Sequence, residues 1–148
     1  MELEAALADF EVSRREWEDA FARVPDAALT YLKPGDDYAL GGLQVHVNWV
    51  LAHYGRVLDG MIGAGFEEIG PQDPPGAEEH AREGAKRGLT PDERSRSLDE
   101  MAHLHDTVRA TVAELPAANW ARIASRESDP VTDTTPEPVR PAVRAGTA

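Results

Sequence analysis

The amino-acid sequence predicts an all-α protein: an antiparallel helical bundle of three long helices, followed by a disordered C-terminal tail. Two observations support this fold class. In three separate segments, apolar side chains recur every three or four residues, which places them on one face of an α-helix. From residue 125 onward the chain contains no Leu, Ile, Met, Phe, Trp or Tyr, so it cannot bury enough apolar surface to offset the entropy of ordering.

The first helix is expected over residues 2–24 and ends at Pro25. Its stripe contains one polar side chain, and the acidic residues lie mostly on the other face. The stripe consists of Leu3, Leu7, Phe10, Arg14, Trp17, Phe21 and Val24. The connection that follows, residues 25–40, is too apolar for a free linker, and we expect it to pack on the bundle.

The second helix is expected from about residue 40 to residue 62, between glycines that mark its limits. Its apolar stripe, expected to face the core, consists of Leu43, Val47, Val50, Tyr54, Val57, Leu58 and Met61. Residues 64–89 are rich in Gly, Pro and acids, which predicts an exposed loop with one short helical turn around 77–86.

The third helix has the clearest start signal in the chain. Thr90 is placed as the N-cap, Pro91 as the first helical residue and Glu93 as the partner in a capping box. The helix ends at Pro116, and its buried stripe consists of Leu98, Met101, Leu104, Val108, Val112 and Leu115. The chain therefore divides into a helical domain, residues 1–124, and a disordered tail, residues 125–148.

Composition excludes several classes of function. The 148 residues carry 15 Lys and Arg against 27 Asp and Glu, a net charge of -12, which argues against binding to nucleic acid or to an anionic membrane surface. With no Cys, any metal must bind to His, Asp or Glu. No apolar run approaches the roughly 20 residues that span a bilayer, and the acidic N-terminus does not resemble a signal peptide, so we expect a cytoplasmic protein.

Three of the five histidines are candidate metal ligands: His46, His53 and His105. His46 and His53 lie on one flank of the second helix, but about 10.5 Å of helix rise separates them, too far for one ion to bind both. His105 lies within the stripe of the third helix and could meet either one across an interface, with Asp59 or Asp106 as a carboxylate ligand. A histidine at the edge of a stripe is more often simply packed or hydrogen-bonded, and the sequence leaves both interpretations open.

The stretch Tyr38-Ala39-Leu40-Gly41-Gly42-Leu43-Gln44-Val45-His46, continuing to Tyr54, resembles the second helix of DinB-like (YfiT-like) proteins. The order and length of the helices are similar over residues 1–124. The resemblance implies a four-helix bundle in which one His on this helix and a His-x-x-x-His pair on the last helix hold a divalent metal. It matches His46 to the first ligand. No His follows His105, so the chain lacks the other two, and we expect a truncated or frame-altered form that is one helix short.

Two functions follow as expectations. The resemblance implies an enzyme with a divalent metal, zinc or nickel, and in some relatives a low-molecular-weight thiol, acting as a transferase or hydrolase whose metal site is incomplete here. The alternative is a non-catalytic helical interaction module or dimerising bundle, because a missing helix leaves apolar surface uncovered and such patches mark interfaces. In that case the exposed face would bind a partner protein or a second copy of the chain, in a homodimer.

Overall fold

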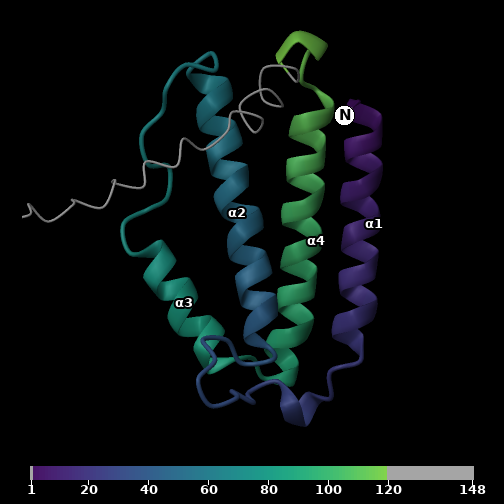
Figure 1. Ribbon diagram of the computed structural model, residues 1–148, viewed down its shortest axis with the longest axis vertical. Helices are drawn as coiled ribbons and strands as arrows, with labels where there is room; N and C mark the ends of the chain where they lie inside the picture. The colour runs from purple at the N-terminus through teal and green to yellow at the C-terminus, as the bar shows by residue number, and fades with distance from the viewer. Residues whose placement is uncertain (1, 120–148) are drawn as a thin grey trace, which may run out of the picture.

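The structure is a computed structural model that describes residues 2–119, and in this part of the chain every regular element is a helix. The helices are α1 (Leu3–Ala22), the short 3-10 helix η1 (Asp26–Ala28), α2 (Gly42–Gly63), α3 (Ala77–Arg87) and α4 (Pro91–Ala113) (Figure 1). The all-α prediction is confirmed, and the three long helices begin and end within a few residues of the expected positions. The predicted boundary at residue 124 and the predicted tail lie outside the described residues.

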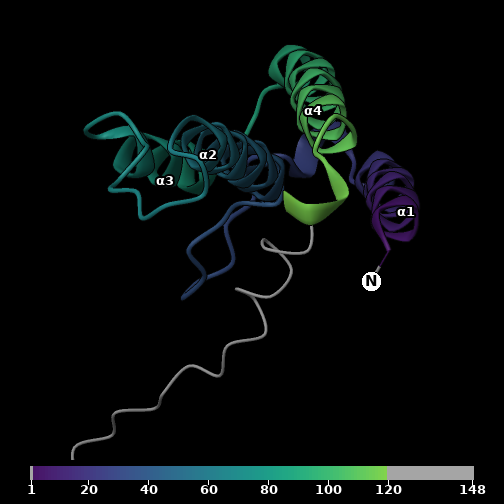
Figure 2. The same cartoon turned by 90° about the horizontal axis from the view of Figure 1, so that it is seen from above.

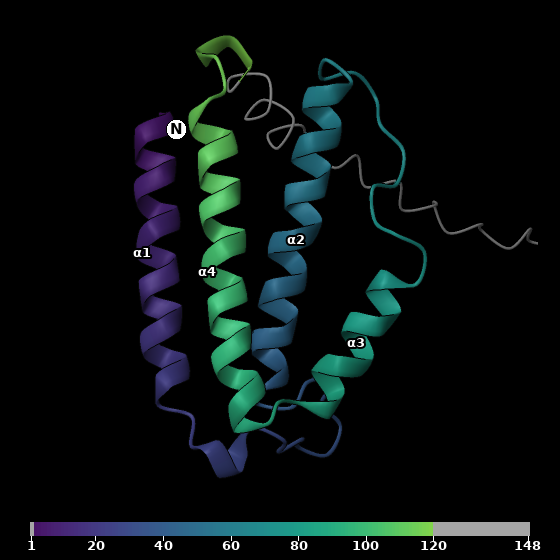
Figure 3. The same ribbon diagram turned by 180° about the vertical axis from the view of Figure 1, so that it is seen from behind.

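The three long helices form an arc, with α4 between α1 and α2, and α3 on the outer flank of α2 (Figures 1 and 2). Successive helices alternate in direction, as Figure 3 also shows from behind. Because α3 runs back along the flank of α2, the neighbours α2 and α4 run parallel to each other, and α1 runs antiparallel to both. None of the helices described between residues 2 and 119 is long and apolar enough to cross a membrane.

Helix α3 is longer than the single turn expected in this region. It has 11 residues, with Glu78 and Glu79 in the first turn and Lys86 and Arg87 in the last, an arrangement that suits the helix dipole. It ends at Gly88, whose φ of 82° is a conformation that favours glycine. The acidic and basic ends thus explain why a segment with few apolar residues still forms a helix.

One end of the bundle is closed by a buried apolar cluster. Phe21, Leu29 and Leu89 form its centre. Trp17, Val24, Val45 and Leu98 pack around them. Leu29 is fully buried, which confirms that the connection over residues 25–40 packs on the bundle. We call this region the closed end.

Arg94 ties α4 to the last turn of α1 at the closed end. Its guanidinium donates hydrogen bonds of 2.6 Å to the carbonyl oxygens of Phe21 and Val24 and one of 2.9 Å to Asp26. The Phe21 oxygen also accepts from the Val24 N–H at 3.0 Å, so Arg94 adds a second bond to a carbonyl in the last turn of α1 and one to a carbonyl just beyond it. Helix α4 itself begins with the predicted capping box of Thr90 and Glu93.

The apolar stripe of α2 is not buried. Of its members, Leu43 and Tyr54 are 38% and 63% exposed, and the others are half-buried. The side chains that α2 buries belong instead to the polar residues Gln44 and Asn48, which face α4. The expectation that this stripe forms the core face is therefore wrong for the described residues. The stripe faces the open, concave side of the arc, where no described helix covers it.

Candidate functional site

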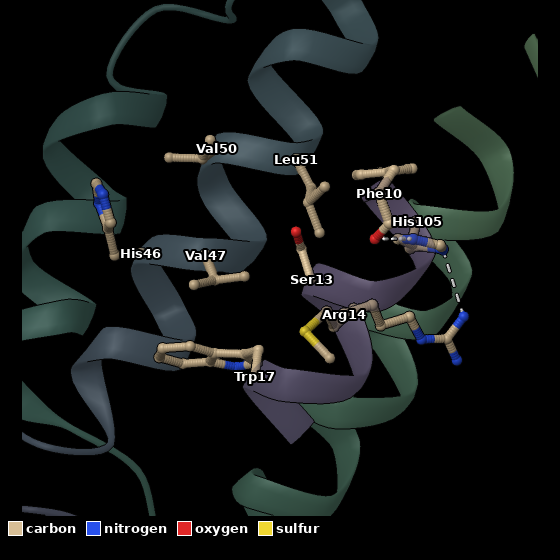
Figure 4. A pocket seen from close by; sticks show the side chains of 10 residues that line it. Phe10, Ser13, Arg14, Trp17, His46, Val47, Val50, Leu51 and His105 are labelled. Atoms are coloured by element: carbon tan, nitrogen blue, oxygen red, sulfur yellow. Dashed lines mark hydrogen bonds between the residues drawn. The ribbon is translucent and has the colours of Figure 1, made fainter. Parts of the chain in front are cut away.

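An apolar groove runs between α1 and α2, with α4 as its floor. It encloses a cavity of about 330 Å³ (Figure 4). Apolar side chains from all three helices dominate its wall, with a few polar groups among them. The lining residues are Phe10, Ser13, Arg14, Trp17, His46, Val47, Val50, Leu51, Met101 and His105.

His105 lies on the floor of the groove, where it is 2% exposed and connects α4 to α1 through hydrogen bonds. Its ring stacks on Phe10 with centroids 4.0 Å apart, and its Nε2–H donates to the Phe10 carbonyl oxygen at 3.3 Å. In the neutral ring, Nδ1 then accepts from Arg14 Nη1 at 3.4 Å. Both ring nitrogens are therefore engaged, and a metal ion at Nδ1 would have to displace the Arg14 guanidinium.

Arg14, the one polar member of the α1 stripe, is neutralised by nearby carboxylates. It donates to Glu18 at 2.9 Å and to Asp106 at 3.1 Å. The hydrogen bond to Glu18 is the largest cause that raises the pKa of Arg14 above its ordinary value. Since the positive charge of Arg14 is already paired with carboxylates, it should attract an anionic ligand only weakly.

A buried hydrogen-bond network closes the lower end of the groove. The Trp17 indole donates to Gln44 Oε1 at 2.7 Å, and Gln44 Nε2 donates to Asn48 Oδ1 at 2.9 Å and to Met101 Sδ at 3.2 Å. Asn48 Nδ2 donates to the Ser97 carbonyl oxygen at 2.9 Å. The network thereby joins α1, α2 and α4. Sequence reasoning missed Gln44 and Asn48, although two amide side chains four residues apart share one helix face.

His46 lies on the wall of the groove, on the opposite side of the cavity from His105 (Figure 4). Its ring stacks on Tyr38, with centroids 4.9 Å apart. Among residues 2–119, its imidazole has no hydrogen-bond partner. Within the described residues, His46 is thus the one member of the predicted histidine set that uses neither ring nitrogen in a hydrogen bond, because His53 uses Nδ1 and His105 uses both.

His53 points away from the groove toward the loop that precedes α3. Its Nδ1–H donates to Asp73 Oδ2 at 2.6 Å, and its ring stacks on Trp49. Arg56 donates two further hydrogen bonds, of 3.0 and 2.8 Å, to Asp73 Oδ1. The bonds from Arg56, followed by the bond from His53, lower the pKa of Asp73 below its ordinary value. The cluster fastens the loop to the flank of α2.

The structure does not bring His46, His53 and His105 together. The first lies beside Tyr38, the second beside Asp73 and the third beside Phe10 and Arg14. Across residues 2–119, no group of three or more His, Asp or Glu side chains is placed to hold a metal ion. Of the two suggested carboxylates, Asp106 lies 3.6 Å from His105 Nδ1 and pairs with Arg14, whereas Asp59 lines a separate pocket near the end of α2.

Comparison with known proteins identifies the family. Searches of curated proteins and of solved structures gave no match. The family model of the DinB superfamily matches residues 9–139, which is more than half of the chain. The match covers α1 from residue 9 onward and all of α2, α3 and α4, and it continues past the described residues. The chain therefore belongs to the DinB superfamily.

Proposed function

We propose that this DinB-superfamily chain is a non-catalytic helical interaction module that takes the apolar side chains of a partner protein into the groove between α1 and α2. The observation that carries the proposal is the open stripe of α2, none of whose members is buried. A contiguous apolar surface of this kind marks an interaction site on a soluble domain. Full burial of a Val or Leu side chain contributes about 1.5–3 kcal/mol, so a partner that covers several of them gains a useful binding free energy.

The polar groups of the groove support recognition by apolar contact. His105, Arg14 and Trp17 all bond within the chain. A partner therefore finds few free hydrogen-bonding groups on the floor, and its affinity must come from the apolar side chains that it buries. This matches the chemistry of a helix-in-groove contact, in which an amphipathic helix lays its apolar face into a hydrophobic channel.

Binding of Nile red, an uncharged apolar dye, tests whether the groove is accessible. An uncharged dye is needed because the net charge of -12 repels anionic probes. At protein concentrations low enough to avoid self-association, we expect the dye to brighten with the wild type and to lose most of this signal with Val50→Asp, which places a charge in the groove. Val12→Asp is the matched control, since Val12 is 50% exposed on α1 and does not line the cavity. Equal dye binding by both variants, or none by the wild type, contradicts the proposal.

A metal-dependent transferase or hydrolase is the second candidate, and His46 is the residue that favours it. The sequence motif around His46 corresponds to the family's first ligand, and its ring nitrogens are available among residues 2–119. The described residues alone do not fit a three-ligand centre, however, because no such group of side chains is present among them. We therefore derive no catalytic step through a metal or a thiol cofactor.

Calorimetric titration of the untagged full chain with zinc and with nickel distinguishes the second candidate from the first. Stoichiometric binding that His46→Ala abolishes would favour the enzyme. His80→Ala is the control, because His80 is an exposed residue of α3 outside the groove. Heats no larger for the wild type than for His46→Ala leave the interaction module as the function.

A further inference from the structure

A small hollow of about 70 Å³ lies between α2 and α3, on the side of α2 that faces α3. We call it the α2–α3 hollow. Its lining includes Tyr38, His46 and Trp49 from the α2 side and Glu78, Ala81 and Arg82 from α3. A space of this size holds a few water molecules or a ligand of about four or five non-hydrogen atoms. We propose that the hollow binds a small uncharged molecule through an amide group, independently of the interaction module proposed above.

Two side chains in the wall of the hollow leave hydrogen-bonding groups unpaired. Trp49 Nε1 is buried, yet its N–H donates to no acceptor within residues 2–119. His46 precedes it by three residues on the same face of α2, and its ring also makes no hydrogen bond in this part of the chain. A buried donor without an acceptor is unfavourable, and a neutral imidazole offers one donor and one acceptor. The wall therefore presents a donor at Trp49 and an acceptor at His46.

The charges around the hollow favour an uncharged ligand. Arg82 already donates to Glu78 at 2.9 Å, and the net charge of -12 repels anions. A cation would leave the Trp49 N–H without an acceptor, because it has none to offer. An amide fits both side chains: its carbonyl oxygen accepts from Trp49, and its N–H donates to His46. Its planar shape also suits packing against the aromatic rings of Tyr38 and Trp49.

The position of Trp49 is fixed, whereas the rim of the hollow is free to move. The Trp49 ring stacks on His53 with centroids 5.0 Å apart, and His53 is itself bonded to Asp73. The indole is therefore held in place before a ligand arrives. Because Nε1 is covered, a ligand reaches it only when a neighbouring side chain shifts. Glu78 and Arg82 are 67% and 70% exposed, and a surface ion pair of this kind opens at little cost.

Titration of the full chain with acetamide, followed through the NMR signals of the indole N–H groups, tests the proposal. The Trp49 signal is identified by its loss in Trp49→Phe. We expect it to shift with saturation in the millimolar range, because so small a ligand makes few contacts, while the Trp17 signal, whose N–H is bonded to Gln44, stays in place. Excess EDTA keeps trace metal from His46. Acetone, which has no N–H, and acetate, which is negatively charged, have the same size and should each bind about fivefold more weakly.

Substitutions on α3 locate the binding. Ala81→Leu fills the hollow and should abolish the saturable shift, whereas the control Ala77→Leu, one turn earlier and outside the hollow, should preserve it. If circular dichroism shows that Ala81→Leu does not fold, Trp49→Phe replaces it, with about fivefold weaker binding read from the backbone amide of Ala85.

Four outcomes would overturn the proposal. A Trp49 signal that never saturates would show that water alone occupies the hollow. Acetate that binds as tightly as acetamide would indicate an anion site, and equal binding of acetone would show that the amide N–H is not recognised. A shift that survives in both Ala81→Leu and Trp49→Phe would place the ligand elsewhere on the protein. None of these results depends on whether the groove binds Nile red.

Discussion

At the scale of single residues, the side chain of Gln44 connects the three long helices α1, α2 and α4. Its side chain is completely buried and bonds to Trp17 of α1, to Asn48 of α2 and to Met101 of α4. A buried amide is favourable only when its donors and acceptors are paired, and here the three helices must be in register for that to happen. The network therefore specifies how α1 and α2 sit on α4 at the closed end.

Replacing Gln44 with Leu should lower the free energy of unfolding by about 1–3 kcal/mol, because the N–H of the half-buried Trp17 loses its acceptor. Urea denaturation measures the loss. The same substitution made in a Trp17→Phe background should have a smaller effect, since no indole donor remains to be left unpaired. If Gln44→Leu destabilises both backgrounds equally, the hydrogen bond to Trp17 contributes nothing to stability.

Asp73 gives the loop before α3 a pH-dependent attachment. Arg56 and His53 lower the pKa of Asp73, so folding favours its ionised form. Its contribution to stability is complete above the unfolded-state pKa of about 3.9 and is lost as the pH falls through the lower, folded-state value. The Tm difference between the wild type and Asp73→Asn should stay constant near neutral pH and shrink below about pH 4. In an Arg56→Gln background, Asp73→Asn should lower the Tm only slightly even at neutral pH. A Tm difference as large as in the wild-type background would exclude Arg56 as the main partner of Asp73.

At the scale of helices, α2 and α3 pack backbone against backbone at Gly42, the first residue of α2. A Cβ added to Gly42 would overlap the backbone carbonyl of Ala85, which itself accepts a hydrogen bond from the Ala39 N–H at 3.0 Å. No side chain fits at this crossing. The start of α2 is therefore where α3 is attached to the bundle.

Gly42→Ala should destabilise the protein by about 1–3 kcal/mol, because the methyl group forces α3 away from α2. Gly63→Ala is the matched control at the other end of the same helix, where a Cβ meets nothing within 4 Å. There the substitution should be neutral or stabilise by up to about 1 kcal/mol. Thermal unfolding of the two variants compares them, and similar destabilisation by both would rule out the clash as the cause.

Local sequence signals predict the bounds of the helices well, but they predict poorly which residues each helix face contacts. Periodicity and the capping box at Thr90 place the long helices within a few residues, because these signals depend only on nearby atoms. Which face is covered depends on what packs against it. The α2 stripe was expected in the core, yet α4 contacts Gln44 and Asn48 instead. Residues of α4, which are distant in sequence, therefore determine which face of α2 is buried. For the same reason the surroundings of His46 and His53 could not be predicted, since Tyr38 and Asp73 come from loops.

At the scale of the whole molecule, the net charge of -12 and the apolar groove respond differently to salt. Because the wall of the groove is mainly apolar, added salt should not weaken the binding of uncharged Nile red, whereas a contact held by ion pairs would weaken. Fluorescence titration in low and in moderate sodium chloride measures the affinity for the dye. Binding that weakens as salt is added would show that charged groups, and not the apolar stripe, hold the dye.

The buried cluster of Phe21, Leu29 and Leu89 lies at the closed end of the bundle, and the groove adjoins it through Trp17, which packs on the cluster and lines the groove. Resistance to local opening should therefore change along a single continuous helix. In α2, amide hydrogens near Gln44 should exchange with solvent deuterium only on global unfolding, whereas those near Met61 should exchange through partial openings that leave the closed end intact. The two ends of α2 should therefore differ in exchange rate, and occupation of the groove should slow exchange most around Val50 and Leu51, which line it.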